Sequence, residues 1–239
     1  PHILVDSVIG WMWLFFEGYD FKNNPLKIEK ETLVKLEKQY RKISQIKYAD
    51  SWGVDFHKGA GGCPVVSSAF VFNHKRDSLL FSKKHNQIEG IFGLHQISER
   101  FNPESPVNYT LENSRSSGPF LSALGSLHTM GKNGFRILLT KLVENASYIE
   151  KLVEKREDID FKTPYKYGFV VMLRLYPPKY AKREYKNKEL NDVQLVNEIN
   201  NYSQEFFKWD KETRMSKNDS PEYAYSTFCY ELPCGIGLH

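Results

Sequence analysis

The residues of this chain best suited to chemistry are His57 and Lys58, which lead straight into the glycine-rich run 59–62. A lysine amine can form an imine with a carbonyl compound, and a lysine that enters a glycine-rich turn is accessible to such a ligand. Most lysines in a basic chain are solvated surface charges, and that alternative also fits Lys58 taken alone. The segment indicates a Schiff-base lysine only if a second chemical group accompanies it.

A second chemical group lies upstream, where Asp6 ends the apolar run 3–5. The run is typical of a buried strand, and carboxylates at the carboxyl ends of such strands face the ligand crevice of an open α/β sheet. Pyridoxal 5′-phosphate (PLP) needs two groups from its protein, a lysine for the imine and a carboxylate for the pyridine nitrogen. Asp6 and Lys58 together predict a PLP site.

Four stretches of the chain resemble, in the same order, the group II PLP-dependent decarboxylases, the family of the glutamate, aromatic amino acid and diaminobutyrate enzymes. The stretches are similar to the strand with the cofactor aspartate, the lysine motif, the Ser-Arg segment with its following helix and turn, and the first small-domain strand. They are Val5 to Gly10, Asp50-Ser51 with His57-Lys58, Thr110 to Gly118 with Leu124 to Phe135, and Gly168 to Arg174.

The resemblance implies an α/β chain made of two parts. Residues 1–160 would be the carboxyl-terminal part of the large, PLP-binding domain of a fold type I transferase, and residues 161–239 a small α+β carboxyl-terminal domain. Family members are longer, so we expect a carboxyl-terminal portion whose amino-terminal half comes from a companion chain. Complete units are expected to pair as homodimers.

The resemblance also implies an activity, the decarboxylation of an amino acid to an amine and carbon dioxide with PLP as cofactor. Lys58 would be the Schiff-base lysine, and Asp6 would keep the pyridine nitrogen protonated. His57 would lie near the cofactor phosphate or the substrate carboxylate. Asp55, which stands where relatives have Asp or Asn, and Ser7 complete the expected cofactor contacts.

The proton donor and the substrate contacts are less well defined. Many family members carry a tyrosine in a mobile loop, but residues 83–106 contain none, so Tyr109 is the nearest candidate, with His85 or His95 as substitutes. An aldehyde-forming or other lyase reaction therefore stays open. Arg115 and Arg174 could each grip a substrate carboxylate or a neighbouring subunit, or form an ion pair that braces the two domains.

The composition excludes several other classes of protein. The net charge of +4 is spread over interspersed acidic and basic residues, which argues against nucleic-acid binding. The three cysteines lack the spacing of a metal site or a disulfide framework. The longest apolar run, 9–16, is too short to span a membrane, so a cytoplasmic enzyme is expected.

The hydrophobic pattern predicts alternating elements. A surface helix with one buried stripe is expected over 29–44, a strand over 67–73, and a helix over 120–130 that ends at Gly131. A longer helix is expected over 135–153, a strand over 168–175 and a helix over 193–206. A domain boundary is placed near residue 160.

One rival hypothesis is a non-catalytic subunit that keeps the fold as an assembly surface. In either case a sheet that starts at the strand of Asp6 would lack neighbours, which leaves apolar surface around 3–5 and 65–72 uncovered. A companion polypeptide is expected to cover it.

Overall fold

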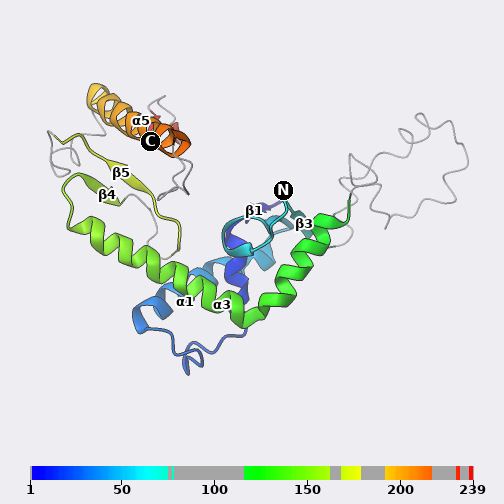
Figure 1. Cartoon of the computed structure of the whole chain (residues 1–239). Coiled ribbons are helices and arrows are strands. Elements are labelled where there is room, and N and C mark those ends of the chain that lie inside the picture. Colours follow the sequence, from blue (N-terminus) through cyan, green and yellow to red (C-terminus); the bar gives the residue numbers. More distant parts are fainter. Residues whose placement is uncertain are drawn as a thin grey trace, which may run out of the picture. The chain divides into compact units, whose positions relative to one another are not determined.

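The computed structural model describes residues 2–74, 77, 116–161, 168–178, 192–216, 230–231 and 237–238. The chain divides into two compact units, Pro1–Lys141 and Leu142–His239, and helix α3 belongs in part to each (Figure 1). The described residues include both helices and small sheets, so the expected α/β class is confirmed at that level. The division into domains near residue 160 stays a prediction.

The first unit contains a sheet of three strands, β1 (Leu4–Asp6), β2 (Ser51–Asp55) and β3 (Ser68–Phe72), in that order. β1 and β2 are parallel, with Asp6 opposite Gly53, whereas β2 and β3 are antiparallel, with Asp55 opposite Ser68. The expected strand over 67–73 is therefore confirmed. The parallel pairing brings the carboxyl ends of β1 and β2 to the same edge of the sheet.

The apolar run at the start of the chain is exposed, as expected for a sheet that lacks a neighbour beyond the strand of Asp6. Ile3 is 55% exposed and Leu4 is 58% exposed. β1 pairs with β2 on one side, and no other strand in the described part of the chain pairs with its second edge. The run therefore forms a strand, as its apolar residues predict, but within this chain the strand is not buried.

The core of the first unit is built around the 3₁₀ helix η1 (Gly10–Phe16), whose Trp11, Met12 and Phe16 are buried. Helix α1 (Lys30–Ile43) packs against η1 through the fully buried Leu36, as its apolar spacing predicts. A second 3₁₀ helix, η2 (Ser44–Tyr48), leads from α1 towards β2.

Helix α3 (Gly118–Glu154) contains a break at Gly131, whose φ of 57° and ψ of 178° are not helical. Gly131 therefore ends the first helical segment, as predicted, because glycine adopts a positive φ without a steric penalty. After the break, the Phe135 ring stacks on Phe15 at 4.1 Å between centroids. Arg136 donates to the carbonyl oxygens of Phe15 and Glu17 at 2.7 and 2.9 Å. These bonds satisfy carbonyl groups at the carboxyl end of η1.

The second unit contains a two-stranded antiparallel sheet, β4 (Ile159–Phe161) with β5 (Leu173–Leu175), and helix α5 (Val193–Ser216). The strand expected over 168–175 is thus only three residues long, whereas helix α5 is confirmed. Tyr176 and Ile199 form a buried core in the second unit. Two short strands, β6 (Tyr230–Glu231) and β7 (Gly237–Leu238), pair near the end of the chain.

Candidate functional site

Asp6 and Lys58 belong to the same edge of the sheet. Asp6 is the last residue of β1, and the parallel strand β2 ends at Asp55, three residues before Lys58. Ligands of α/β sheets bind outside the carboxyl ends of parallel strands. The two groups predicted to hold PLP therefore lie at the edge where such a ligand would be expected.

The turn after β2 fixes the backbone of Lys58. The Lys58 carbonyl accepts from the Gly61 amide at 3.0 Å, which closes the short 3₁₀ helix η3 (Gly59–Gly61). The Phe56 carbonyl accepts from the Cys63 amide at 3.3 Å. A Cβ atom on Gly61 would come within 2.1 Å of the Phe56 oxygen, so only glycine fits there. The glycine-rich run therefore gives the lysine a rigid backbone.

The amine of Lys58 forms an ion pair with Asp55, with 2.6 Å between Nζ and Oδ2. The other carboxylate oxygen accepts a hydrogen bond of 2.5 Å from the Ser68 hydroxyl. The hydrogen bonds from Lys58 and Ser68 hold the pKa of Asp55 below its usual range. Asp55 is buried, whereas the Lys58 side chain is 45% exposed. Asp55 is thus the buried, charged partner of a lysine whose side chain is still accessible to solvent.

A side chain of η1 forms a hydrogen bond with the backbone of Asp55. The indole N–H of Trp11 donates to the Asp55 carbonyl at 3.0 Å, and the Trp11 ring packs edge-on against Phe56 at 5.2 Å. Neither Trp11 nor Ser68 was predicted from the sequence to be part of the site. Ser68 could have been found from the antiparallel register, but Trp11 gives no local signal, because it lies 44 residues away along the chain.

The His57 ring is half-buried and lies against Ser67, the residue directly before β3. Its Nδ1 atom is 3.0 Å from the Ser67 carbonyl oxygen and 3.2 Å from the Ser67 amide nitrogen. Which of these contacts is a hydrogen bond depends on the ring tautomer. In both tautomers the ring position is set by the backbone of Ser67.

Asp6 and Ser7 differ in their hydrogen bonds. Asp6 is exposed and accepts from the Val8 amide at 3.2 Å, a bond within its own turn. Ser7 is buried and donates its only hydroxyl proton to the Gly53 carbonyl at 2.6 Å. The Asp6 carboxylate can accept a further bond from a ligand, whereas the Ser7 hydroxyl is used to join β1 to β2. A cofactor contact by Ser7 stays a prediction.

Of the remaining expected site residues, the structure describes Arg174 but neither Tyr109 nor Arg115. Arg174 lies in β5 of the second unit, where it is buried and its Nη2 is 3.5 Å from Asn200 Oδ1. Its expected contact with a substrate or a subunit stays a prediction. Tyr109, Arg115 and the two histidines His85 and His95 lie outside the described residues.

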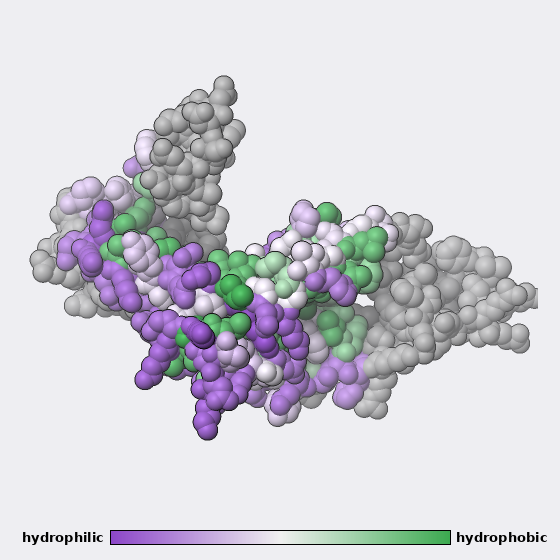
Figure 2. All heavy atoms as spheres, turned by 60° about the horizontal axis from the view of Figure 1, so that its bottom comes forward, coloured by the Kyte–Doolittle hydropathy of each residue, from purple (hydrophilic) through white to green (hydrophobic). Residues whose placement is uncertain are grey.

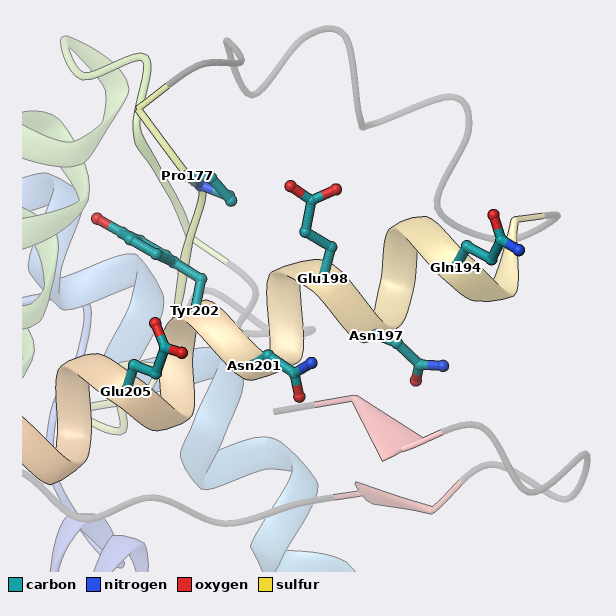
Figure 3. A pocket seen from close by; sticks show the side chains of 7 residues that line it. All are labelled: Pro177, Gln194, Asn197, Glu198, Asn201, Tyr202 and Glu205. Carbon is teal, nitrogen blue, oxygen red and sulfur yellow. The ribbon is translucent and has the colours of Figure 1, made fainter.

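A cavity of about 510 Å³ lies along one face of helix α5 in the second unit (Figure 3). Its lining is mostly polar and contains none of the residues expected in a PLP site. The lining residues are Pro177, Gln194, Asn197, Glu198, Asn201, Tyr202 and Glu205. The cavity is therefore a feature of the second unit, whereas the Lys58 edge belongs to the first.

Two kinds of feature are absent from the described residues. Within the ranges given above, no group of three or more His, Cys, Asp and Glu side chains is arranged to hold a metal ion. Across the same ranges, every helix is too short or too polar to cross a bilayer.

Comparisons with known proteins show a likeness in structure but none in sequence. Neither a family model nor a curated protein matches the chain. A crystal structure of mouse CSAD, cysteine sulfinic acid decarboxylase, is similar with a TM-score of 0.53 and 14% identity, covering 98% of this chain and 40% of that chain. Its apo form gives a TM-score of 0.50 and 14% identity, covering 98% and 39%.

The likeness to mouse CSAD bears on the fold. At 14% identity it shows a common fold and nothing finer, and the chain spans about two fifths of the length of the solved chains it matches. It is consistent with part of a fold type I α/β domain.

Proposed function

We propose that the chain is part of a PLP-dependent amino-acid decarboxylase, with Lys58 as the residue that attaches the cofactor and Asp6 as the partner of its pyridine nitrogen. The observation that carries the proposal is the position of both residues after neighbouring parallel strands. The likeness of the fold to mouse CSAD, a PLP-dependent decarboxylase, supports it.

The described residues fit the chemical needs of PLP. Lys58 offers a primary amine that is accessible to solvent, and primary amines are the side chains that bind an aldehyde covalently. Asp6 offers an exposed carboxylate, which favours the protonated form of a ring nitrogen bonded to it. When bound, PLP supplies an electron sink for the charge left on the α-carbon as carbon dioxide leaves.

The residues around Lys58 would position this chemistry. The turn that ends at Gly61 fixes the Lys58 backbone, so that only the lysine side chain has to move between Asp55 and a ligand. His57 is the neighbouring group that can donate to or accept from a phosphate or a carboxylate, and Ser67 sets its orientation.

We also propose that a companion polypeptide covers the open side of the first unit, and that complete units form a two-fold dimer. Ile3, Leu4 and Phe70 are exposed, and Val66 is 74% exposed. The space-filling view shows hydrophobic side chains reaching the surface among hydrophilic ones (Figure 2). Apolar surface of this kind marks an interaction site.

Reductive trapping tests the proposed function. The chain, purified with any polypeptide bound to it, is incubated with PLP and treated with borohydride, and its peptides are analysed by mass spectrometry. We expect phosphopyridoxyl at Lys58 in preference to other lysines. An absorption band at the violet end of the visible spectrum should be lost on reduction. Labelling spread evenly over exposed lysines such as Lys132 would overturn the assignment.

A non-catalytic subunit is the second candidate, and the ion pair between Lys58 and Asp55 favours it. A lysine that only braces the end of β2 would make this contact without any cofactor. Failure of trapping at Lys58, together with an assembly that stays colourless in PLP, would support this candidate. A violet-edge band that depends on Lys58 would exclude it.

A further inference from the structure

We infer that Asp55 acts as a positioning residue that keeps the Lys58 amine in an ion pair, and that a carbonyl ligand must displace this carboxylate before the lysine can react. The inference rests on the proposed function in one respect, since PLP is the carbonyl ligand that it concerns. It adds a residue whose role is to restrain the reactive amine.

The geometry of Asp55 supports this restraint. Its two carboxylate oxygens have different partners, Lys58 Nζ at 2.6 Å and Ser68 Oγ at 2.5 Å. Ser68 lies directly opposite Asp55 in the β2–β3 register, so its hydroxyl is fixed by the sheet. The Trp11 indole N–H donates a hydrogen bond to the Asp55 carbonyl, which also restrains the backbone of Asp55. The carboxylate therefore cannot easily follow the lysine when the lysine leaves.

The Lys58 side chain, in contrast to the Asp55 carboxylate, has room to move. Its backbone is fixed by the turn to Gly61, but its side chain is 45% exposed and can rotate into solvent. The mobile partner of the ion pair is the nucleophile, and the fixed partner is the carboxylate. This division is what a releasable restraint on the amine requires.

The chemistry explains why the restraint matters. An amine attacks a carbonyl carbon through its nitrogen lone pair, so the ammonium group must first lose a proton to solvent. The nitrogen then bonds to the carbon, and the carbonyl oxygen leaves as water. The 2.6 Å contact with Asp55 must break before Nζ can reach a carbonyl carbon. Asp55 also holds its charge, because Lys58 and Ser68 keep its pKa low, so it is a poor acceptor for that proton.

Reductive methylation measures the restraint without any cofactor. Formaldehyde condenses with the neutral amine and releases water, and hydride from cyanoborohydride reduces the imine carbon to a methyl group. The full chain, with any bound polypeptide, is treated at neutral pH, and the rate at Lys58 is divided by the rate at exposed Lys132. We expect Asp55→Asn to raise this ratio about fivefold.

Matched variants separate restraint from general loosening. Asp55→Glu retains the carboxylate and should return the ratio towards the wild-type value. Glu31→Gln breaks the 2.9 Å ion pair of Lys35 on α1 and should speed methylation of Lys35 while leaving Lys58 unchanged. An unchanged ratio in a folded Asp55→Asn protein would overturn the inference.

A measurement on the wild-type chain covers the case in which Asp55→Asn does not fold. High salt screens a solvent-accessible ion pair. Raising KCl should therefore raise the Lys58 ratio, by about twofold at 1 M where the Debye length falls to about 3 Å. A flat salt response would count against the restraint.

The two proposals fail differently. If salt or Asp55→Asn releases Lys58 towards formaldehyde but borohydride traps no PLP there, the restraint is right and the proposed function is wrong. If PLP is trapped at Lys58 while formaldehyde reacts equally fast in wild type and variant, the function stands and the restraint is wrong.

Discussion

The carboxyl ends of β1 and β2 each finish with an aspartate, but the two carboxylates have opposite surroundings. Asp6 is exposed, and the hydrogen bond described for it lies within its own turn. Asp55 is buried and has a charged and a neutral donor, one on each oxygen. A carboxylate whose two oxygens both accept bonds from the protein has a structural role, whereas an exposed carboxylate can bind a ligand. Similar strand ends thus favour two different roles.

The largest expected effect in this comparison comes from Lys58, the ion-pair partner of Asp55. Lys58→Ala should abolish amine formation in the assembled protein, by at least about a thousandfold or 4 kcal/mol of barrier, because no other side chain replaces the anchor. Carbon dioxide release measures the rate, and circular dichroism checks the fold. Lys132→Ala, on the exposed face of α3, is the control. Turnover within about tenfold of wild type would refute the lysine assignment.

Asp6→Asn sharpens the comparison by separating rate from stability. We expect the rate to fall by about a hundredfold, on the order of 3 kcal/mol of barrier, because an amide does not favour the protonated ring nitrogen. Thermal unfolding should be unchanged, since the side chain is exposed. Asp20→Asn, at another exposed turn aspartate, should leave the rate unchanged, although it weakens the hydrogen bonds that Asp20 accepts from Lys22 and Asn23 and should lower stability. An unchanged rate in Asp6→Asn would mean that Asp6 only ends a strand.

Gly61→Ala tests the rigidity of the β2 end. The new methyl group would collide with the Phe56 carbonyl at 2.1 Å, and the backbone must shift to relieve it. We expect a loss of about 2 to 3 kcal/mol in the free energy of unfolding, measured in urea. Gly125→Ala is the matched control, because that Cβ meets no atom within 4 Å in α3. It should be neutral or slightly stabilising. Equal effects of the two substitutions would contradict the packing described for the turn.

Asp55→Asn should reduce stability by about 1 to 2 kcal/mol, because a charge-assisted hydrogen bond to Lys58 is lost. The pKa of Asp55 is lowered in the folded protein, so its contribution is complete above the unfolded carboxyl pKa. That contribution declines as the pH falls through the unfolded value and is lost below the folded pKa. Urea unfolding over acidic pH should show a flatter profile for Asp55→Asn than for wild type. Parallel profiles would show that Asp55 does not couple to folding.

Periodic patterns predicted the helices well, because a helix that buries one stripe repeats its apolar residues every three or four positions. Leu36 in α1 and Phe135 in α3 lie in the stripes that the spacing indicated, and Gly131 breaks α3 as expected. Strand β4 was not predicted, because three residues within a charged stretch give no measurable alternation. Short strands are defined by their partners rather than by their own sequence.

The candidate site was predicted in part. The sequence indicated that Asp6 ends a strand, but the strand before Lys58 was not predicted. The parallel register of β1 and β2 places both residues at one edge of the sheet. The ion pair of Lys58 with Asp55 was not foreseen, because the spacing of three residues has no fixed geometry outside a helix. The exposure of Leu4 was expected, since burial of a strand depends on what covers it and this sheet lacks a neighbour beyond β1.

The contact of Trp11 with the end of β2 gives the chain an optical reporter. The fluorescence of an indole responds to the polarity around its ring and to the hydrogen bond of its N–H group. Trp11 is buried, packs on Phe56 and donates to the carbonyl of Asp55, so its emission senses the segment that carries Lys58. A chain that retains Trp11 as its only tryptophan would therefore signal movement of this turn in real time, without an attached dye.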